Sequence, residues 1–372
     1  MALFLLSPII AELMLGSSPP LAFVLLSWTN IPMYGGGAVL IRELAIRWRK
    51  GWPTIIALGV AYAVAEEGII IRTFFDVNAS PIAGLKDYGW LFGANWVWIT
   101  SMSIYHSLVS IALPIMLVTM AFPERAREPW VSTRWLGRAV AAFLAIAAIW
   151  LAFWHAAVDG RLIIASVVAI ELIGVVAYLL PAEFPLPGMR PASAAGPGSA
   201  PAVRSSPAVR SAPGPWRVVV TVAVSILGVF FMAISKAGPP IVPIVGQLAI
   251  AGALLWWLGR ASAAPGWTDR QRFAVAVGVF TCMWLFSPVV ELAGGFGQLV
   301  VTGVGIWVSW RIWSILRDEE LGENAADNAN AADHTDAADA AAAEAPDETA
   351  PDAPESAESA ESAGEKAATP TD

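Results

Sequence analysis

The chain has 372 residues, of which 57% are hydrophobic and only 14% are charged. That balance is too apolar for a water-soluble domain of this size and makes a lipid bilayer part of the solvent. The net charge of −8 is unevenly spread, because residues 318–372 hold 17 of the 30 acidic residues and only Lys366 among the 22 basic ones. The rest of the chain therefore has a basic surplus.

Several classes of function are excluded by what the sequence lacks. The single cysteine, Cys282, allows neither a disulfide framework nor a cysteine-based zinc site. No phosphate-binding loop, dinucleotide fingerprint or basic aromatic patch is present, so we expect no nucleotide and no nucleic acid as a partner.

Apolar segments recur along the chain at the length of a membrane span, which is about 20 residues. The first, 2–15, is short and contains Pro8 and Glu12. It lacks the basic start of a cleavable signal, so we interpret it as a retained membrane segment that spans or re-enters. The nine full-length candidates are 21–47, 53–74, 95–121, 137–158, 162–181, 217–235, 241–259, 272–293 and 298–316. The sequence predicts an all-α, polytopic transmembrane bundle of nine or ten helices.

The second segment contains Pro32 and the run Gly35-Gly36-Gly37, which predicts a broken helix. Membranes tolerate such a break only where protein or water satisfies the freed backbone groups. A broken helix is typical of functional sites, but a kink filled by a neighbouring helix explains the pattern equally well.

Basic residues gather in alternate loops, which predicts the orientation of the chain in a cell membrane. By this rule the linker and the C-terminal tail are cytoplasmic. The residues concerned are Arg47, Arg49, Lys50, Arg125, Arg127, Arg134, Arg138, Arg190, Arg204, Arg210, Arg260, Arg270 and Arg272.

Composition divides the chain into four parts. We expect an N-terminal bundle with a polar intramembrane cluster in residues 1–181 and a plainer four-helix bundle in 216–317. Between them, residues 182–215 are rich in Pro, Ala, Ser and Gly and are typical of a flexible linker. Residues 318–372 lack the apolar surface needed to fold, so we expect a disordered acidic tail.

Ionisable groups inside apolar spans mark the candidate site, because a charge at a span centre costs about 2.5–3.5 kcal/mol. Arg42 and Glu43 lie near a span end, which favours a paired or snorkelling role. Glu66 and Glu67 lie deeper. Adjacent helical residues point about 100° apart, so we expect these two carboxylates to have different partners.

Two of the three histidines, His106 and His155, also fall in spans, at depths within about 10 Å of the carboxylate pair. Asp159 follows His155 by one helical turn and is placed to orient its imidazole. Glu67, His106 and His155 form a common ligand set for catalytic zinc or another divalent metal. The same groups suit a proton relay in a transporter or a polar network that fastens helices together.

The order of these residues resembles the CAAX-processing and bacteriocin-processing (CPBP) membrane endopeptidases, whose motifs are Glu-Glu-x-x-x-Arg, Phe-x-x-x-His and His-x-x-x-Asn/Asp. The matching stretches are Glu66-Glu67 with Arg72, Met102 with His106, and His155 with Asp159. The resemblance implies that Glu66 or Glu67 activates water, while His106, His155 and Asp159 shape the site or bind a metal.

The leading hypothesis from sequence is a membrane-embedded, CPBP-like hydrolase that acts on a membrane-associated peptide or small molecule. A proton-coupled transporter or permease for a small solute or lipid, and a non-catalytic accessory protein, stay open as alternatives. All three have membrane lipids as partners.

Overall fold

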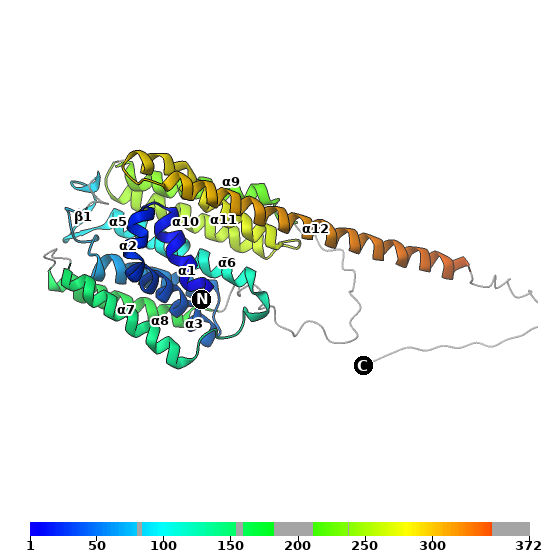
Figure 1. Ribbon diagram of the computed structural model, residues 1–372, viewed down its shortest axis with the longest axis horizontal. Coiled ribbons are helices and arrows are strands. Elements are labelled where there is room, and N and C mark those ends of the chain that lie inside the picture. Colours follow the sequence, from blue (N-terminus) through cyan, green and yellow to red (C-terminus); the bar gives the residue numbers. More distant parts are fainter. Residues whose placement is uncertain (80–83, 154–158, 182–210, 237, 344–372) are drawn as a thin grey trace, which may run out of the picture. The chain divides into compact units, whose positions relative to one another are not determined.

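The computed structural model (Figure 1) describes residues 1–79, 84–153, 159–181, 211–236 and 238–343. It divides into one compact unit, Met1–Arg317, and a second unit, Asp318–Asp372. Candidate membrane spans among the described residues number nine, with a shorter apolar helix at Ala2–Met14. The predicted polytopic helical bundle is confirmed.

Helices make up nearly all of the regular structure in Met1–Arg317. A two-stranded antiparallel hairpin of β1 (Trp90–Leu91) and β2 (Ala94–Asn95) lies in the connection before α5. The α-helices are α1 (Ala2–Pro8), α2 (Pro20–Asn30), α3 (Gly36–Arg47), α4 (Trp52–Ala63), α5 (Trp96–Tyr105), α6 (Leu113–Ala121), α7 (Thr133–Phe153), α8 (Gly160–Leu179), α9 (Pro215–Ile234), α10 (Ile241–Ser262), α11 (Asp269–Leu292) and α12 (Gln298–Ala343).

Four of the N-terminal helical segments contain a π-helical turn. These turns are η1 (Ile9–Met14), η2 (Ile31–Gly35), η3 (Val64–Ile70) and η5 (His106–Ala112). Such turns are rare, and they are frequent at functional sites. The expected break at Pro32 is therefore wrong: the helix runs without interruption from Pro20 to Arg47 and accommodates the proline in η2.

Among the spans whose ends are described, two have C-terminal ends that lie at least four residues from the predicted position. The helix expected over 53–74 ends at Ile70, because Arg72 has a φ of 65° and leaves the helical path. The span expected to end at residue 316 continues as one helix to Ala343, through an alanine-rich stretch of high helix propensity. Residues 344–372 of the predicted tail lie outside the described residues.

The core of Met1–Arg317 joins early and late parts of the chain. One apolar cluster surrounds α3 and α4. A second contains Ile10 and Val109 together with Val218, Val222 and Phe280 from α9 and α11. Whether 1–181 and 216–317 fold as separate bundles stays a prediction.

The ion pair of Arg42 and Glu43 anchors the connection between α6 and α7. Both side chains are fully buried and lie 3.0 Å apart. Arg42 donates to the carbonyls of Arg125, Ala126 and Glu128 and stacks on Trp130, with its guanidinium carbon 3.4 Å from the ring centroid. The predicted paired role of Arg42 and Glu43 is confirmed.

A substitution at Gly35 tests the close contact between η2 and α1, because a Cβ at this position would overlap the backbone carbonyl of Phe4. Gly35→Ala should destabilise the protein by about 1–3 kcal/mol, as overpacking does. Thermal unfolding in detergent measures the loss. The control is Gly174→Ala, since a Cβ there meets nothing within 4 Å; an equal effect of both variants would contradict the contact.

Candidate functional site

The four π-helical turns bring five polar side chains together inside the membrane-spanning region. They are Glu12 from η1, Tyr34 from η2, Glu66 and Glu67 from η3, and His106 from η5, and we call them the polar cluster. Four of them are buried, with exposed fractions of 0% for Glu66, 2% for His106, 3% for Tyr34 and 7% for Glu67, while Glu12 is partly buried. Each buried group therefore depends on its neighbours rather than on water for hydrogen bonds.

His106 is held between the two adjacent glutamates. Its Nε2 lies 3.1 Å from Glu67 Oε1, and its Nδ1 lies 3.2 Å from Glu66 Oε2. Ser110 Oγ lies 3.2 Å from the same Nδ1. The hydrogen bond to Glu67 and the Glu66 carboxyl group on the other side of the ring restrict the orientation of the imidazole.

Tyr34 joins Glu66 to a third carboxyl group. The phenol oxygen lies 2.6 Å from Glu12 Oε1 and also forms a hydrogen bond with Glu66 Oε1. The Tyr34 ring stacks near the His106 ring, with centroids 6.2 Å apart. Three carboxyl groups, one phenol and one imidazole thus form a continuous chain of contacts.

Hydroxyl groups continue this chain at both ends. Ser18 Oγ donates to Glu12 Oε2 over 2.6 Å. At the other end Thr73 Oγ1 donates to Glu67 Oε2, and Trp98 Nε1 donates to the threonine oxygen over 3.0 Å. Ser18 follows η1 and Thr73 follows η3, so each end of the chain lies just beyond a helix end.

The sequence supports this geometry with small residues and hydroxyl groups. A Cβ on Gly59 would lie 2.6 Å from Cα of Ser107, so a glycine is needed where α4 meets η5. Ser7 Oγ lies 2.8 Å from the carbonyl of Ser110 and 3.2 Å from that of Tyr34. These contacts supply partners for backbone carbonyls in two π-helical turns.

Three of the predicted site residues, Glu66, Glu67 and His106, converge. The expectation that the two glutamates have different partners is wrong, since both contact His106. The physical reason is η3: a π-helical turn has more residues than an α-helical turn, so successive side chains diverge less.

The other predicted site residues have different outcomes. Asp159 is exposed and accepts a hydrogen bond from the backbone N–H of Arg161, which makes it the N-cap of α8. It has no recorded contact with the polar cluster. His155 lies outside the described residues, so its role stays a prediction.

The predicted metal site is only partly described. Among the residues that the structure covers, no group of three or more His, Cys, Asp or Glu side chains is arranged to hold a metal ion. Of the ligand set Glu67, His106 and His155, the first two contact each other. Metal binding by this set stays a prediction.

Glu12 and Tyr34 were missing from the predicted site. Glu12 carried a usable signal, because an acid in an apolar segment needs a partner. The sequence signal for Tyr34 is only its position directly before the run Gly35-Gly36-Gly37. Neither signal identified Glu66 as the common neighbour, which depends on how α1, α2 and α4 pack.

Hydrogen counting gives the chemical state of the Tyr34 bridge. Two contacts, to Glu12 and to Glu66, each require one hydrogen, whereas the phenol supplies one. If both contacts are hydrogen bonds, one carboxyl group carries a proton and donates it to the phenol oxygen. The arrangement of Glu12, Tyr34 and Glu66 is therefore chemically suited to share one proton.

Removing the bridging hydroxyl tests this geometry. Tyr34→Phe leaves two buried carboxyl oxygens without their shared partner and should cost about 1–3 kcal/mol of stability, measured by thermal unfolding in detergent. The loss should be smaller in Tyr34→Phe/Glu66→Gln, because one of the two facing carboxyl groups is then gone. Tyr178→Phe, at a 54% exposed tyrosine, is the control; an effect as large there would contradict the bridge.

Comparison with known proteins identifies a family for the chain but assigns no activity to it. No curated protein and no solved structure matches it. A family model does match, and it does not support the resemblance to the CPBP endopeptidases. Because that model covers residues 1–314, the chain belongs to an uncharacterized membrane protein family.

Proposed function

We propose that this protein is a proton-coupled membrane carrier and that the polar cluster is its proton-binding centre. The observation that carries the proposal is the contact of the Tyr34 oxygen with carboxyl oxygens of both Glu12 and Glu66, which is suited to share a proton. A fixed helix-fastening network needs no exchangeable proton. A carrier does, because proton uptake and release must change the stability of its two states.

The charge of the polar cluster depends on its protons. Three carboxyl groups lie with one imidazole in a region where an unpaired charge costs several kcal/mol. Loss of the proton at Tyr34 would set two carboxylates against the same phenol oxygen, and their repulsion would push η1 and η3 apart. Gain of a proton would draw them together again.

The π-helical turns provide elements that such a change can move. A π-helical turn contains one residue more than the α-helical path it replaces, so its conversion to α-helix shifts the register of the residues beyond it. Each turn that carries a cluster residue can therefore convert a change in protonation into a helix movement. The cargo that fits a carrier of this kind is a small solute or a lipid.

The ends of the hydrogen-bonded chain suggest the route of the proton. Ser18, Thr73 and Trp98 lie near the helix ends that adjoin the β1–β2 connection and the turn after η1. By the charge of the alternate loops this side is extracytoplasmic. We propose that protons exchange with that side of a cell membrane, with the linker and the tail on the cytoplasmic side.

Proton-driven uptake tests the proposal directly. The full chain is reconstituted in liposomes, an inward pH gradient is imposed in a mixture of small molecules extracted from cells, and mass spectrometry identifies what accumulates. At least one compound should accumulate, and a protonophore should prevent it. Glu66→Gln should reduce accumulation to the level of protein-free liposomes, because the bridge can no longer exchange its proton.

The matched control is Glu171→Gln, since Glu171 is an exposed glutamate within a span, on α8. It should transport like the unmodified protein. Absence of any gradient-dependent accumulation, or equal transport by Glu66→Gln, would overturn the carrier proposal.

A hydrolase is the second candidate, favoured by the contact between Glu67 and His106. A carboxylate paired with an imidazole can take the proton from an attacking water. Glu67 is also the more exposed of the two adjacent glutamates, at 7% against 0%. Because both ring nitrogens of His106 contact carboxylates, the ring would have to release one of them to act as a base.

Hydrolysis is tested on the purified full chain with fluorescently labelled casein and a labelled transmembrane peptide. If the hydrolase is correct, one substrate is cleaved and Glu67→Gln abolishes cleavage. Elemental analysis of the same preparation should find about one zinc per chain if Glu67 and His106 are ligands, and a chelator should then remove the activity. Proton-driven uptake without cleavage of either substrate would contradict this candidate.

A further inference from the structure

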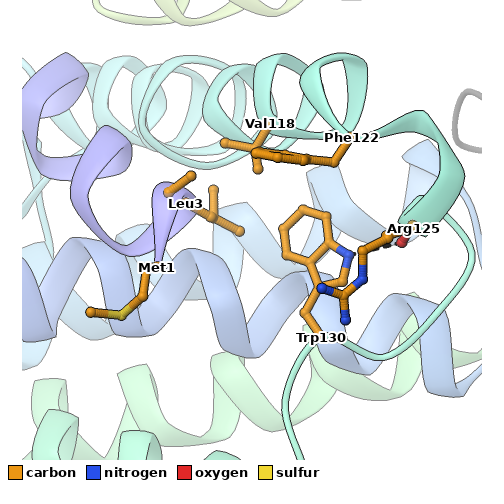
Figure 2. Close-up of a pocket in the computed structure, with 7 residues that line it drawn as sticks. Met1, Leu3, Val118, Phe122, Arg125 and Trp130 are labelled. Atoms are coloured by element: carbon orange, nitrogen blue, oxygen red, sulfur yellow. Dashed lines mark hydrogen bonds between the residues drawn. The ribbon is translucent and has the colours of Figure 1, made fainter.

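Two neighbouring cavities meet beside the connection between α6 and α7. The smaller, of about 280 Å³, is lined by Met1, Ala2, Leu3, Val118, Phe122, Arg125 and Trp130. Figure 2 shows Leu3, Val118 and Phe122 in one part of this pocket and Arg125 and Trp130 in another. The pocket thus combines apolar walls with a cationic group.

The larger cavity, of about 810 Å³, is a groove between α1–η1, α6, α11 and α12. It shares Ala2, Val118 and Phe122 with the smaller pocket, so the two adjoin. Among the described residues that line it, the polar side chains are those of Asp269 and Ser309. The combined space has a cationic, aromatic end and a long apolar body.

The groove lies along one side of α12, while other residues of that helix hold it to its neighbours at three places. At its start Gln298 donates to the carbonyls of Leu13 and Met14, over 3.0 and 3.2 Å. Next along the helix, Thr302 Oγ1 donates to Ser287 Oγ on α11 over 2.6 Å. Further along, Trp313 packs on Trp216, with ring centroids 5.1 Å apart, and receives the guanidinium of Arg270. Between these ties Val300 and Val304 are 70% and 56% exposed.

The length of the groove matches one lipid chain. Val300 and Leu316 both line it and lie sixteen positions apart on α12, which is about 24 Å at ~1.5 Å per residue. One leaflet contributes roughly 15 Å of hydrocarbon to a core of about 30 Å. An acyl chain that starts beside Phe122 therefore fits within the groove.

The charge at the pocket favours an anionic headgroup. Arg125 is exposed, and among the described residues its guanidinium has no recorded ion pair. Residues 122–138 contain four arginines against Glu124 and Glu128. The one carboxylate in the groove, Asp269, is paired with Arg272.

We infer that the two cavities bind one anionic phospholipid, with its phosphate beside Arg125 and an acyl chain in the groove against α12. Basic pockets between spans recognise such headgroups, and burial of the acyl chain in an apolar groove favours binding. This inference does not rest on the proposed carrier function, because it concerns different residues and needs no proton.

Lipid binding to the delipidated full chain in detergent, followed by native mass spectrometry, tests the inference. Dioleoylphosphatidylglycerol should bind about fivefold more tightly than dioleoylphosphatidylcholine, since one arginine near the headgroup is worth about 1 kcal/mol. Arg125→Gln should remove that preference. Val304→Trp, which fills the groove, should weaken the binding of both lipids.

Matched controls are Arg134→Gln, an exposed arginine outside the pocket lining, and Leu172→Trp, at a 61% exposed position on α8. Both should bind the two lipids like the unmodified chain. Equal affinity for the two lipids, or unchanged binding by Val304→Trp, would overturn the inference. Displacement by glycerol 3-phosphate would also overturn it, because the site would then bind a free anion rather than a lipid.

Discussion

The hydrogen bonds of one phenol group, Tyr34, join the first three helical segments of this protein at the polar cluster. The Tyr34 hydroxyl forms hydrogen bonds with the carboxyl groups of Glu12 and Glu66, which come from different helices. The buried Glu66 carboxyl group needs such a partner, because an unpaired polar group is costly away from water. The contacts of Tyr34 therefore contribute to the packing of α1–η1, α2–η2 and α4–η3.

The first helical segment, α1–η1, contacts the polar cluster with one face and lines the groove with another. Glu12 points to the polar cluster, while Ile9, Leu13 and Met14 on the same segment line the groove beside α12. A movement of η1 in response to protonation would therefore also reshape the groove. This arrangement gives a physical route by which a bound lipid and the proton-binding centre could influence each other's stability.

The Arg42–Glu43 ion pair and the polar cluster, both in the N-terminal half, differ in the partners of their side chains. Arg42 donates to three backbone carbonyls and stacks on Trp130, and Glu43 accepts from the backbone N–H of Trp130, so this pair holds a connection in place. The side chains of the polar cluster instead contact one another. Burial and charge alone do not separate a structural group from a functional one; the chemistry of the partners does.

The sequence by itself determined the membrane class, nine spans and the choice of Glu66, Glu67 and His106 as neighbours in one intramembrane cluster, because hydrophobic length and the cost of buried charge act locally along the chain. Only the tertiary structure decided that both glutamates contact one imidazole and that Glu12 and Tyr34 join them. Those contacts depend on π-helical turns and on helix packing, which no local pattern in the sequence specifies. The same packing also determines the groove at α12, because its walls come from helices that are far apart in the sequence.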